Sequence, residues 1–122
     1  MISCNIPNEV VCGEPMSGTV TWTPESEKSP RKITLTFGWR TEGRGSTASE
    51  DVIICEHDPG VISAGRPVEM PFEIQIPEEV PVSFNGELIR VIWSLKIRVD
   101  LPWAFDEKHE RAFRVLGRQV TA

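Results

Sequence analysis

The sequence contains few of the residues on which metal, redox and nucleic-acid chemistry depend. Its 122 residues include only three cysteines and two histidines, and no two cysteines have the C-x-x-C spacing of a zinc ribbon. An odd number of cysteines without a secretion signal favours reduced thiols, which commonly pack in protein cores. Thirteen basic residues against eighteen acidic ones give a net charge of −5. This charge disfavours general binding to nucleic acid, which needs a cationic surface.

Long apolar runs are also missing. No segment approaches the roughly 18 residues that indicate a transmembrane helix, and the N-terminal Met1–Pro7 lacks the basic start and apolar stretch of a signal peptide. We therefore expect a cytoplasmic protein with no integral membrane segment. The length and the 39% hydrophobic content predict one globular domain over residues 1–122, without a linker, an internal repeat or a low-complexity tract.

The sequence does contain a two-residue hydrophobic period, which is the pattern of half-buried β-strands. Apolar residues occupy the odd positions of Ile33–Trp39 and the even positions of Val68–Ile76. Proline lacks the N–H group that a central strand needs, so Pro71 places the second segment at a sheet edge or at a bulge. The longest pattern runs over Glu87–Leu101. A strand of this length is expected to bend or to pass between two sheets.

Trp93 lies in the middle of that longest pattern, where one large ring can contact both layers of a core. Weaker strand patterns cover Ile2–Ile6, Glu9–Cys12, Ser17–Thr23, Val52–Glu56 and Arg111–Leu116. Only Asp106–Ala112 has the composition of a short helical turn. About seven strands separated by Gly- and Pro-containing turns predict an all-β fold, an immunoglobulin-like sandwich of two antiparallel sheets. No cysteine follows Cys55, which excludes the disulfide of an immunoglobulin domain proper.

A turn with the sequence Pro81-Val82-Ser83-Phe84-Asn85-Gly86 precedes the longest strand pattern, which ends in Asp100-Leu101-Pro102. Upstream, Gly13–Val20 has the form G-x-x-x-x-G-x-V. These motifs resemble those of the arrestin-like β-sandwich family, and the resemblance covers most of the chain. It implies an arrestin-like fold and an adaptor or scaffold role without catalytic residues. Members usually contain two such sandwiches, whereas one fits here, so the resemblance implies no particular partner.

The residues themselves give little support for catalysis, and we expect neither an enzyme nor a bound metal or cofactor. In the segment Glu56-His57-Asp58, successive strand residues point to opposite faces, so the three side chains cannot reach one ion. His109 lies in a charged segment typical of a solvated turn. Cys55 and His57 share a strand face but stand roughly parallel, which is unfavourable for a nucleophile–base pair.

A cationic stripe is the first candidate for a partner contact. Arg90, Lys96 and Arg98 lie on the outward face of the longest strand pattern, in a chain of net negative charge. The stripe is either a solvated face balanced by glutamates of a neighbouring strand or a docking face for an acidic partner segment. Arg44, in the glycine-containing loop after Arg40, is a further candidate for an anion contact, although a plain hairpin tip is the simpler interpretation.

Trp103 and Phe105 form the second candidate, because two large apolar side chains lie in a segment that looks like a loop. They either cap the open end of the sandwich or form an exposed association patch. A sheet edge is a third candidate, since a second copy of the chain or an extended peptide can add a strand there. We therefore expect a protein-interaction module whose protein partner is unidentified. The alternatives are a self-associating structural subunit and a small-molecule-binding sandwich.

Overall fold

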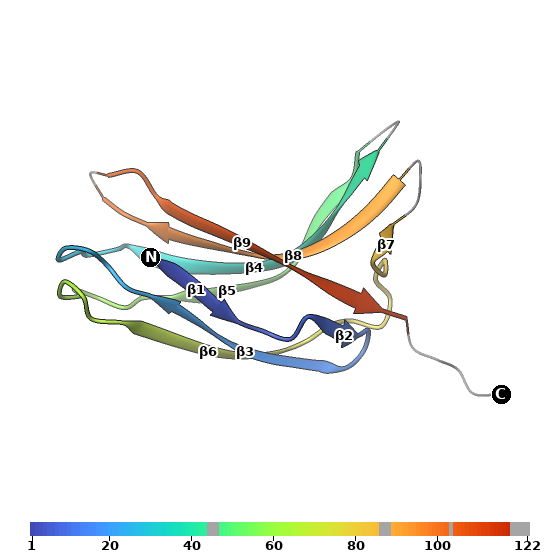
Figure 1. Cartoon of the computed structure of the whole chain (residues 1–122), viewed down its shortest axis with the longest axis horizontal. Helices are drawn as coiled ribbons and strands as arrows, with labels where there is room; N and C mark the ends of the chain where they lie inside the picture. Colours follow the sequence, from blue (N-terminus) through green and yellow to red (C-terminus); the bar gives the residue numbers. More distant parts are fainter. Residues whose placement is uncertain (44–46, 86–88, 103, 118–122) are drawn as a thin grey trace.

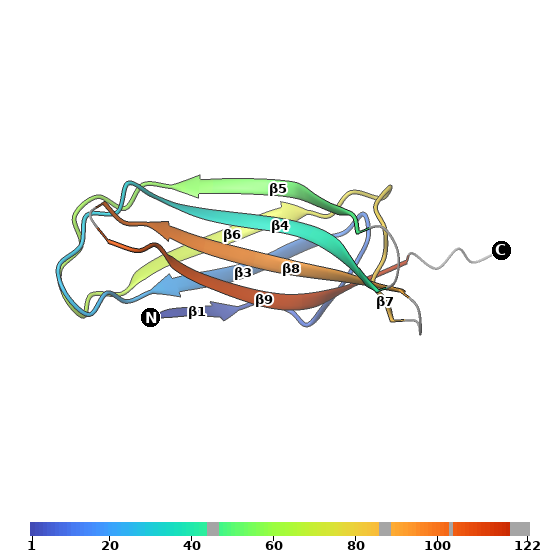
Figure 2. The ribbon, with the colours of Figure 1, turned by 90° about the horizontal axis from the view of Figure 1, so that it is seen from above.

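Two β-sheets lie face to face in the computed structural model, which describes residues 1–43, 47–85, 89–102 and 104–117 (Figure 1). Within these residues the strands are β1 (Ile2–Asn5), β2 (Glu9–Val11), β3 (Pro15–Trp22), β4 (Lys32–Gly43), β5 (Ser49–His57), β6 (Val68–Gln75), β7 (Phe84–Asn85), β8 (Ile89–Asp100) and β9 (Glu107–Leu116). The smaller sheet has the order β1-β3-β6. The larger sheet has the order β2-β9-β8-β4-β5, with β7 paired to β8, and Figure 2 shows it covering the smaller sheet. The prediction of an all-β, two-sheet sandwich is confirmed.

The strands β4 and β8 form the centre of the larger sheet, where they pair antiparallel over twelve residues. Their odd-numbered side chains point inward, as the two-residue period predicted. The most deeply buried of these are Ile33, Leu35 and Phe37 in β4 and Leu95, Ile97 and Val99 in β8, none of which is more than 4% exposed. This inner row packs against the smaller sheet, where the Phe72 ring meets the Phe37 ring edge-on with 5.0 Å between centroids.

Trp93 is completely buried at the middle of this row, which confirms its predicted place in the core. In the register of the larger sheet it stands between Trp39 of β4 and Phe113 of β9. Its ring lies 6.1 Å from that of Phe113, and its Nε1–H donates a 2.7 Å hydrogen bond to the carbonyl of Pro81. The indole therefore fills the core and also satisfies its own polar group.

The turn motif around Pro81 fastens β9 as well as β8. The amide of Ser83 donates to the carbonyl of Val115 at 2.8 Å, and the Ser83 hydroxyl accepts a 2.9 Å hydrogen bond from the amide of Val115. Ser83 thus binds a strand more than thirty residues away in the sequence. Gly86, the last residue of the motif, lies outside the described residues.

The smaller sheet is built around the eight-residue pairing of β3 with β6. Pro71 lies in β6, and β6 is an edge strand, as its proline predicted. Opposite Phe72, the sequence places Gly18. A Cβ atom at Gly18 would lie only 2.7 Å from the carbonyl oxygen of Asn5 and 2.9 Å from the Phe72 ring. Only glycine leaves room there for the ring that connects the two sheets.

Two expectations differ from the structure. The helical turn predicted over Asp106–Ala112 is wrong, because this segment enters β9, which pairs with β8 from Glu107 onward. Its charged residues lack an apolar alternation, so only the pairing with β8 reveals the strand. In addition, the larger sheet is not purely antiparallel, since β2 pairs in parallel with the end of β9.

All three cysteines are free thiols that pack in or against the core, as predicted. Cys12 is buried, while Cys4 and Cys55 are partly buried. Burial raises the pKa of the Cys4 thiol, and the nearby positive charge of Arg111 offsets only part of this effect.

Replacing Trp93 tests the core. Trp93→Ala leaves a large cavity and should lower the free energy of unfolding by about 3–5 kcal/mol. Trp93→Phe keeps an aromatic ring but leaves the Pro81 carbonyl without its donor, which should cost about 1–3 kcal/mol. Urea denaturation followed by circular dichroism measures both changes.

Phe105→Ala is the matched control, because Phe105 is 98% exposed and its loss should change stability by no more than about 0.5 kcal/mol. An unfolding midpoint of Trp93→Ala equal to that of the control would show that the indole does not hold the two sheets together.

Candidate functional site

The outer face of the larger sheet, which points away from the smaller sheet, carries the polar side chains of the paired strands. Because the odd-numbered residues of β4 and β8 pack inward, even-numbered ones such as Thr36, Lys96 and Arg98 point outward. Figure 1 shows β4, β5 and β8 curving away from the smaller sheet toward the end where β4 turns into β5. This curvature makes the outer face concave.

A concavity of about 670 Å³ lies on this face, over β5, β4, β8 and β9, and we call it the outer concavity. Its charged lining residues are Lys32, Glu56, Lys96, Arg98, Lys108 and Glu110. The hydroxyl-bearing Thr34 and Thr36 and the apolar Ile54 contribute to its floor and rim. Four cationic side chains against two carboxylates make this surface locally positive, although the whole chain carries a net charge of −5.

Ion pairs hold two of the four cations of this face. Lys32 binds Glu56 at 3.3 Å, and Arg98 binds Asp106 at 2.6 Å. Within the described residues, Lys96 and Lys108 have no carboxylate within the 4.0 Å of an ion pair. These two lysines are therefore the cations most available to an incoming anion.

Asp106 fixes the guanidinium of Arg98 at one end of the outer concavity. Its carboxylate accepts hydrogen bonds from Arg98 Nε at 2.6 Å and from the backbone amide of Leu101 at 3.3 Å. The hydrogen bond from Arg98 is the main reason that the pKa of Asp106 is lowered, and burial opposes this shift only in part. Arg98 thus holds the connection between β8 and β9 and is less available for binding than the two lysines.

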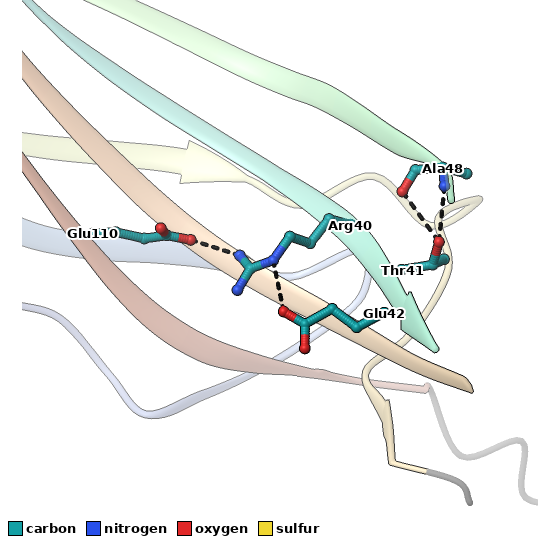
Figure 3. Close-up of polar contacts among 5 residues, drawn as sticks. All are labelled: Arg40, Thr41, Glu42, Ala48 and Glu110. Carbon is teal, nitrogen blue, oxygen red and sulfur yellow. Dashed lines mark hydrogen bonds and ion pairs between the residues drawn. The ribbon is translucent and has the colours of Figure 1, made fainter. Parts of the chain in front are cut away.

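Arg40 does not line the outer concavity itself, but its side chain reaches across β8 to Glu110, which does (Figure 3). Its Nη1 donates to Glu110 of β9 at 2.6 Å, and its Nε donates to Glu42 of its own strand at 3.2 Å. Beside it, the Thr41 hydroxyl accepts a 2.8 Å hydrogen bond from the amide of Ala48, which holds β4 against β5 (Figure 3). Arg40 therefore binds two carboxylates, and Glu110, which stands opposite Lys96 in the register, is held by Arg40 and not by Lys96.

Glu110 is the carboxylate on which this network converges. Partial burial disfavours its charged form, but hydrogen bonds from Ser94 and Arg40, together with the charges of Arg40 and Lys96, outweigh burial, so the pKa of Glu110 is lowered. Conversely, the pKa of Arg40 is raised because bonding to Glu110 and Glu42 exceeds the effect of its desolvation. Both groups stay charged at neutral pH.

The structure separates the three residues of the predicted cationic stripe. Lys96 and Arg98 lie together in the outer concavity, in register with Glu110 and Lys108 of β9. Arg90 lies further along β8, opposite Glu42 in the register with β4, and lines a different hollow beside Ser83 and Phe84. Lys96 and Arg98 therefore remain candidates for docking, while acidic residues of neighbouring segments stand beside Arg90 and Arg98.

Among the remaining predicted contacts, Phe105 does not line the outer concavity. Phe105 is 98% exposed, so it does not cap the open end of the sandwich. Arg44 and Trp103 lie outside the described residues. Arg40, which precedes the loop of Arg44, is occupied by two carboxylates.

Lys32 and Lys108 are the site residues that the sequence did not single out. Lys32 precedes the strand pattern Ile33–Trp39 and has no signal of its own, and Lys108 lies in the segment that was expected to form a helical turn. The register alone brings them to the site: Lys108 stands opposite Arg98, and Arg98 stands opposite Thr34. A sequence signal for Lys108 exists only after β9 is recognised as the partner of β8.

The residues considered for catalysis show no arrangement that supports it. Cys55 is partly buried, opposite the inward-facing Leu35 of β4, whereas His57 is exposed at the end of β5. In the part of the chain that the structure describes, no three His, Cys, Asp or Glu side chains are grouped so as to hold a metal ion. The same part contains no helix of the length and hydrophobicity needed to cross a membrane.

Known proteins match both the sequence and the fold. Residues 50–120, more than half of the chain, match the family described as arrestin (or S-antigen), N-terminal domain. The chain therefore belongs to this arrestin family. Arrestin domain-containing protein 17 of Caenorhabditis elegans is 35% identical over 49 residues, which are 40% of this chain and 12% of that protein.

The crystal structure of Spo0M, a sporulation control protein from Bacillus subtilis, has the same fold. It superposes with a TM-score of 0.78 over 96% of this chain at 17% sequence identity. The chain corresponds to about half (49%) of the Spo0M chain and to a much smaller part of the curated relative. Members of the arrestin-like family typically act as adaptors in protein interactions.

The Glu110 network should make stability depend on acidic pH. The lowered pKa means that the Glu110 carboxylate stabilises the folded chain above its unfolded-state pKa, and this contribution is lost as the pH falls through the folded-state value. Glu110→Gln should therefore lose less stability than the wild type between pH 7 and pH 3, by up to about 1 kcal/mol for such an exposed network. Urea denaturation at the two pH values measures this difference.

Glu25→Gln, at an exposed glutamate of the β3–β4 connection, provides the control. It should lose as much stability on acidification as the wild type. If Glu110→Gln behaves like this control, the network with Arg40 does not contribute to folding stability.

Proposed function

We propose that this chain is a non-enzymatic protein-interaction module of the cytoplasm, and that it binds an acidic segment of a protein partner in the outer concavity. The observation that carries the proposal is the convergence of Lys32, Lys96, Arg98 and Lys108 from three strands on one concave surface. Its membership of the arrestin family, whose members are typically adaptors, supports a role in binding.

The charge distribution favours an acidic partner. Carboxylates near the outer concavity are already bound by other cations, since Glu56 is held by Lys32 and Glu110 by Arg40. An incoming carboxylate therefore meets Lys96 and Lys108 without displacing an existing ion pair. Because the rest of the chain is acidic overall, such a partner is steered toward this face and away from others.

The chemistry of the floor suits an extended peptide. Thr34 and Thr36 lie in β4 between the cationic strands and the apolar Ile54 of β5. Their hydroxyls can donate to carboxylate or carbonyl oxygens of the ligand, while Ile54 offers an apolar contact. A segment that alternates acidic and apolar residues would use both parts of the surface.

Charge reversal at one lysine tests the proposal. The probe is a fluorescein-labelled peptide of eight glutamates, with a peptide of eight lysines as the comparison, and binding is followed by fluorescence anisotropy at low and physiological salt. We expect the acidic peptide to bind and the basic peptide not to bind. Lys96→Glu should weaken binding about tenfold, because one attractive ion pair of about 1 kcal/mol becomes a repulsion. Added salt should weaken it further.

Arg66→Glu is the matched control, since it changes the net charge equally but lies exposed in the β5–β6 connection. It should weaken binding by less than about twofold, the effect of net charge alone. Equal losses in Lys96→Glu and Arg66→Glu would mean that the acidic peptide senses only the net charge, and the outer concavity would then not be the binding site.

A further inference from the structure

The strand β5 forms a free edge of the larger sheet. It pairs with β4 on one side, and no strand of the described chain pairs with its other side. An edge of this kind presents unpaired backbone N–H and C=O groups to any strand that comes alongside.

The other edges are protected in ways that β5 is not. The edge strand β6 carries Pro71 between Glu69 and Glu73, and proline and charge both discourage pairing. The edge strands β1 and β2 are only four and three residues long. The strand β2 covers only the end of β9, and the uncovered part of β9 begins with the charged segment Glu107–Arg111, which discourages pairing. By contrast, β5 is nine residues long, and its middle, Val52-Ile53-Ile54-Cys55, contains neither charge nor proline.

Ile54 is the exposed apolar residue of this segment. It is 58% exposed and stands opposite Thr36 on the outer face, at the rim of the outer concavity. The register between β4 and β5 shifts between Phe37 and Gly38, which is near the beginning of β5. Regular pairing of β5 with β4 therefore begins only after Val52. A Cβ atom at Gly38 would lie 2.4 Å from the carbonyl oxygen of Glu50, and this close approach requires glycine.

We propose that β5 is a self-association edge, through which two copies of this chain pair antiparallel over Val52–Glu56 with Ile54 facing Ile54 of the second copy. A two-fold axis at Ile54 places Ile53 opposite Cys55 and Val52 opposite Glu56, so no like charges stand directly opposite in this segment. The two exposed isoleucines cover one another, and the free backbone groups of both edges are paired.

The charges at β5 favour a second copy over the acidic segment proposed for the outer concavity. Glu50 and Asp51 precede the apolar segment, and Glu56 follows it. An acidic strand laid along β5 would meet these carboxylates, whereas a second copy can match its apolar middle to the same apolar middle. In the self-paired arrangement, Glu56 keeps its ion pair with Lys32 and faces only Val52.

Self-pairing would join the larger sheets of two copies into one continuous sheet. Both outer concavities would then lie on the same side of that sheet, because a two-fold axis perpendicular to it keeps both outer faces on one side. The dimer would present two equivalent cationic surfaces, and a partner with two acidic segments could bind both at once. The self-association itself does not depend on the proposed function.

Sedimentation equilibrium over a wide concentration range, under reducing conditions, tests the association. The average mass of the wild-type chain should rise from 13.7 kDa toward twice that value. Ile54→Lys places two lysines face to face and should raise the dissociation constant of the dimer at least about tenfold. Val61→Lys, at a residue 66% exposed in the β5–β6 connection, should change it by less than about twofold.

A wild-type mass that stays at 13.7 kDa at millimolar concentration would overturn the proposal. Equal weakening by the Ile54 and Val61 substitutions would overturn it as well. Lys96→Glu separates the two proposals, since it should weaken binding of the acidic peptide about tenfold and leave the dimer intact.

Cysteine cross-linking tests the register. In a chain with its three native cysteines replaced by alanine, Ile54→Cys should form an intermolecular disulfide on mild oxidation, because facing residues of an antiparallel pair have Cα atoms about 4.5–5.5 Å apart. Glu50→Cys in the same background should not, since its two copies would lie more than about 20 Å apart. Cross-linking of both at similar rates, or of Glu50→Cys alone, would contradict pairing at Ile54. The cysteine-free chain must first show the wild-type sedimentation behaviour; if it does not, Ile54→Cys and Glu50→Cys are compared in the native background.

Discussion

The antiparallel pairing of β4 with β8 is the interaction on which the rest of this structure depends. Its inner row seals the core, and its outer row carries the cations of the outer concavity. Because side chains alternate with a period of two, a slip of one residue would turn Lys96 and Arg98 into the core and Leu95 out to solvent. Burying unpaired charges costs several kcal/mol, so the core fixes the register and the register fixes the site.

Hydrogen bonds from two buried tryptophans connect the larger sheet to the segments around it. Trp22 in the smaller sheet donates to Glu107 of β9, and Trp93 donates to the carbonyl of Pro81 before β7. Ser83 adds the paired backbone contact with Val115. The strand β9 is thereby held near both of its ends, which places its first half, with Lys108 and Glu110, along the edge of the outer concavity.

How much of this was predictable from the sequence depends on whether a residue belongs to an apolar alternation. The alternation placed Trp93 in the core and put Lys96 and Arg98 on one outer face, and the proline placed β6 at an edge. It failed for Lys108 and Glu110, because Glu107–Glu110 has no apolar residue to mark a strand. Ion pairs such as Arg40 with Glu110 join residues seventy positions apart, and no local pattern encodes how far a side chain reaches across a neighbouring strand.

The inward apolar residues account for the fold that this chain shares with its family, whereas the outward residues are particular to this chain. Spo0M shares the fold at only 17% identity, so the architecture is maintained by the pattern of inward apolar residues and turns, whatever the individual residues are. Outward residues are not constrained by that pattern. The lysines of the outer concavity and the uncharged middle of β5 therefore do not follow from membership of the family. Binding specificity must be sought in these features of the chain's own surface, because a shared fold supplies the scaffold and the site supplies the function.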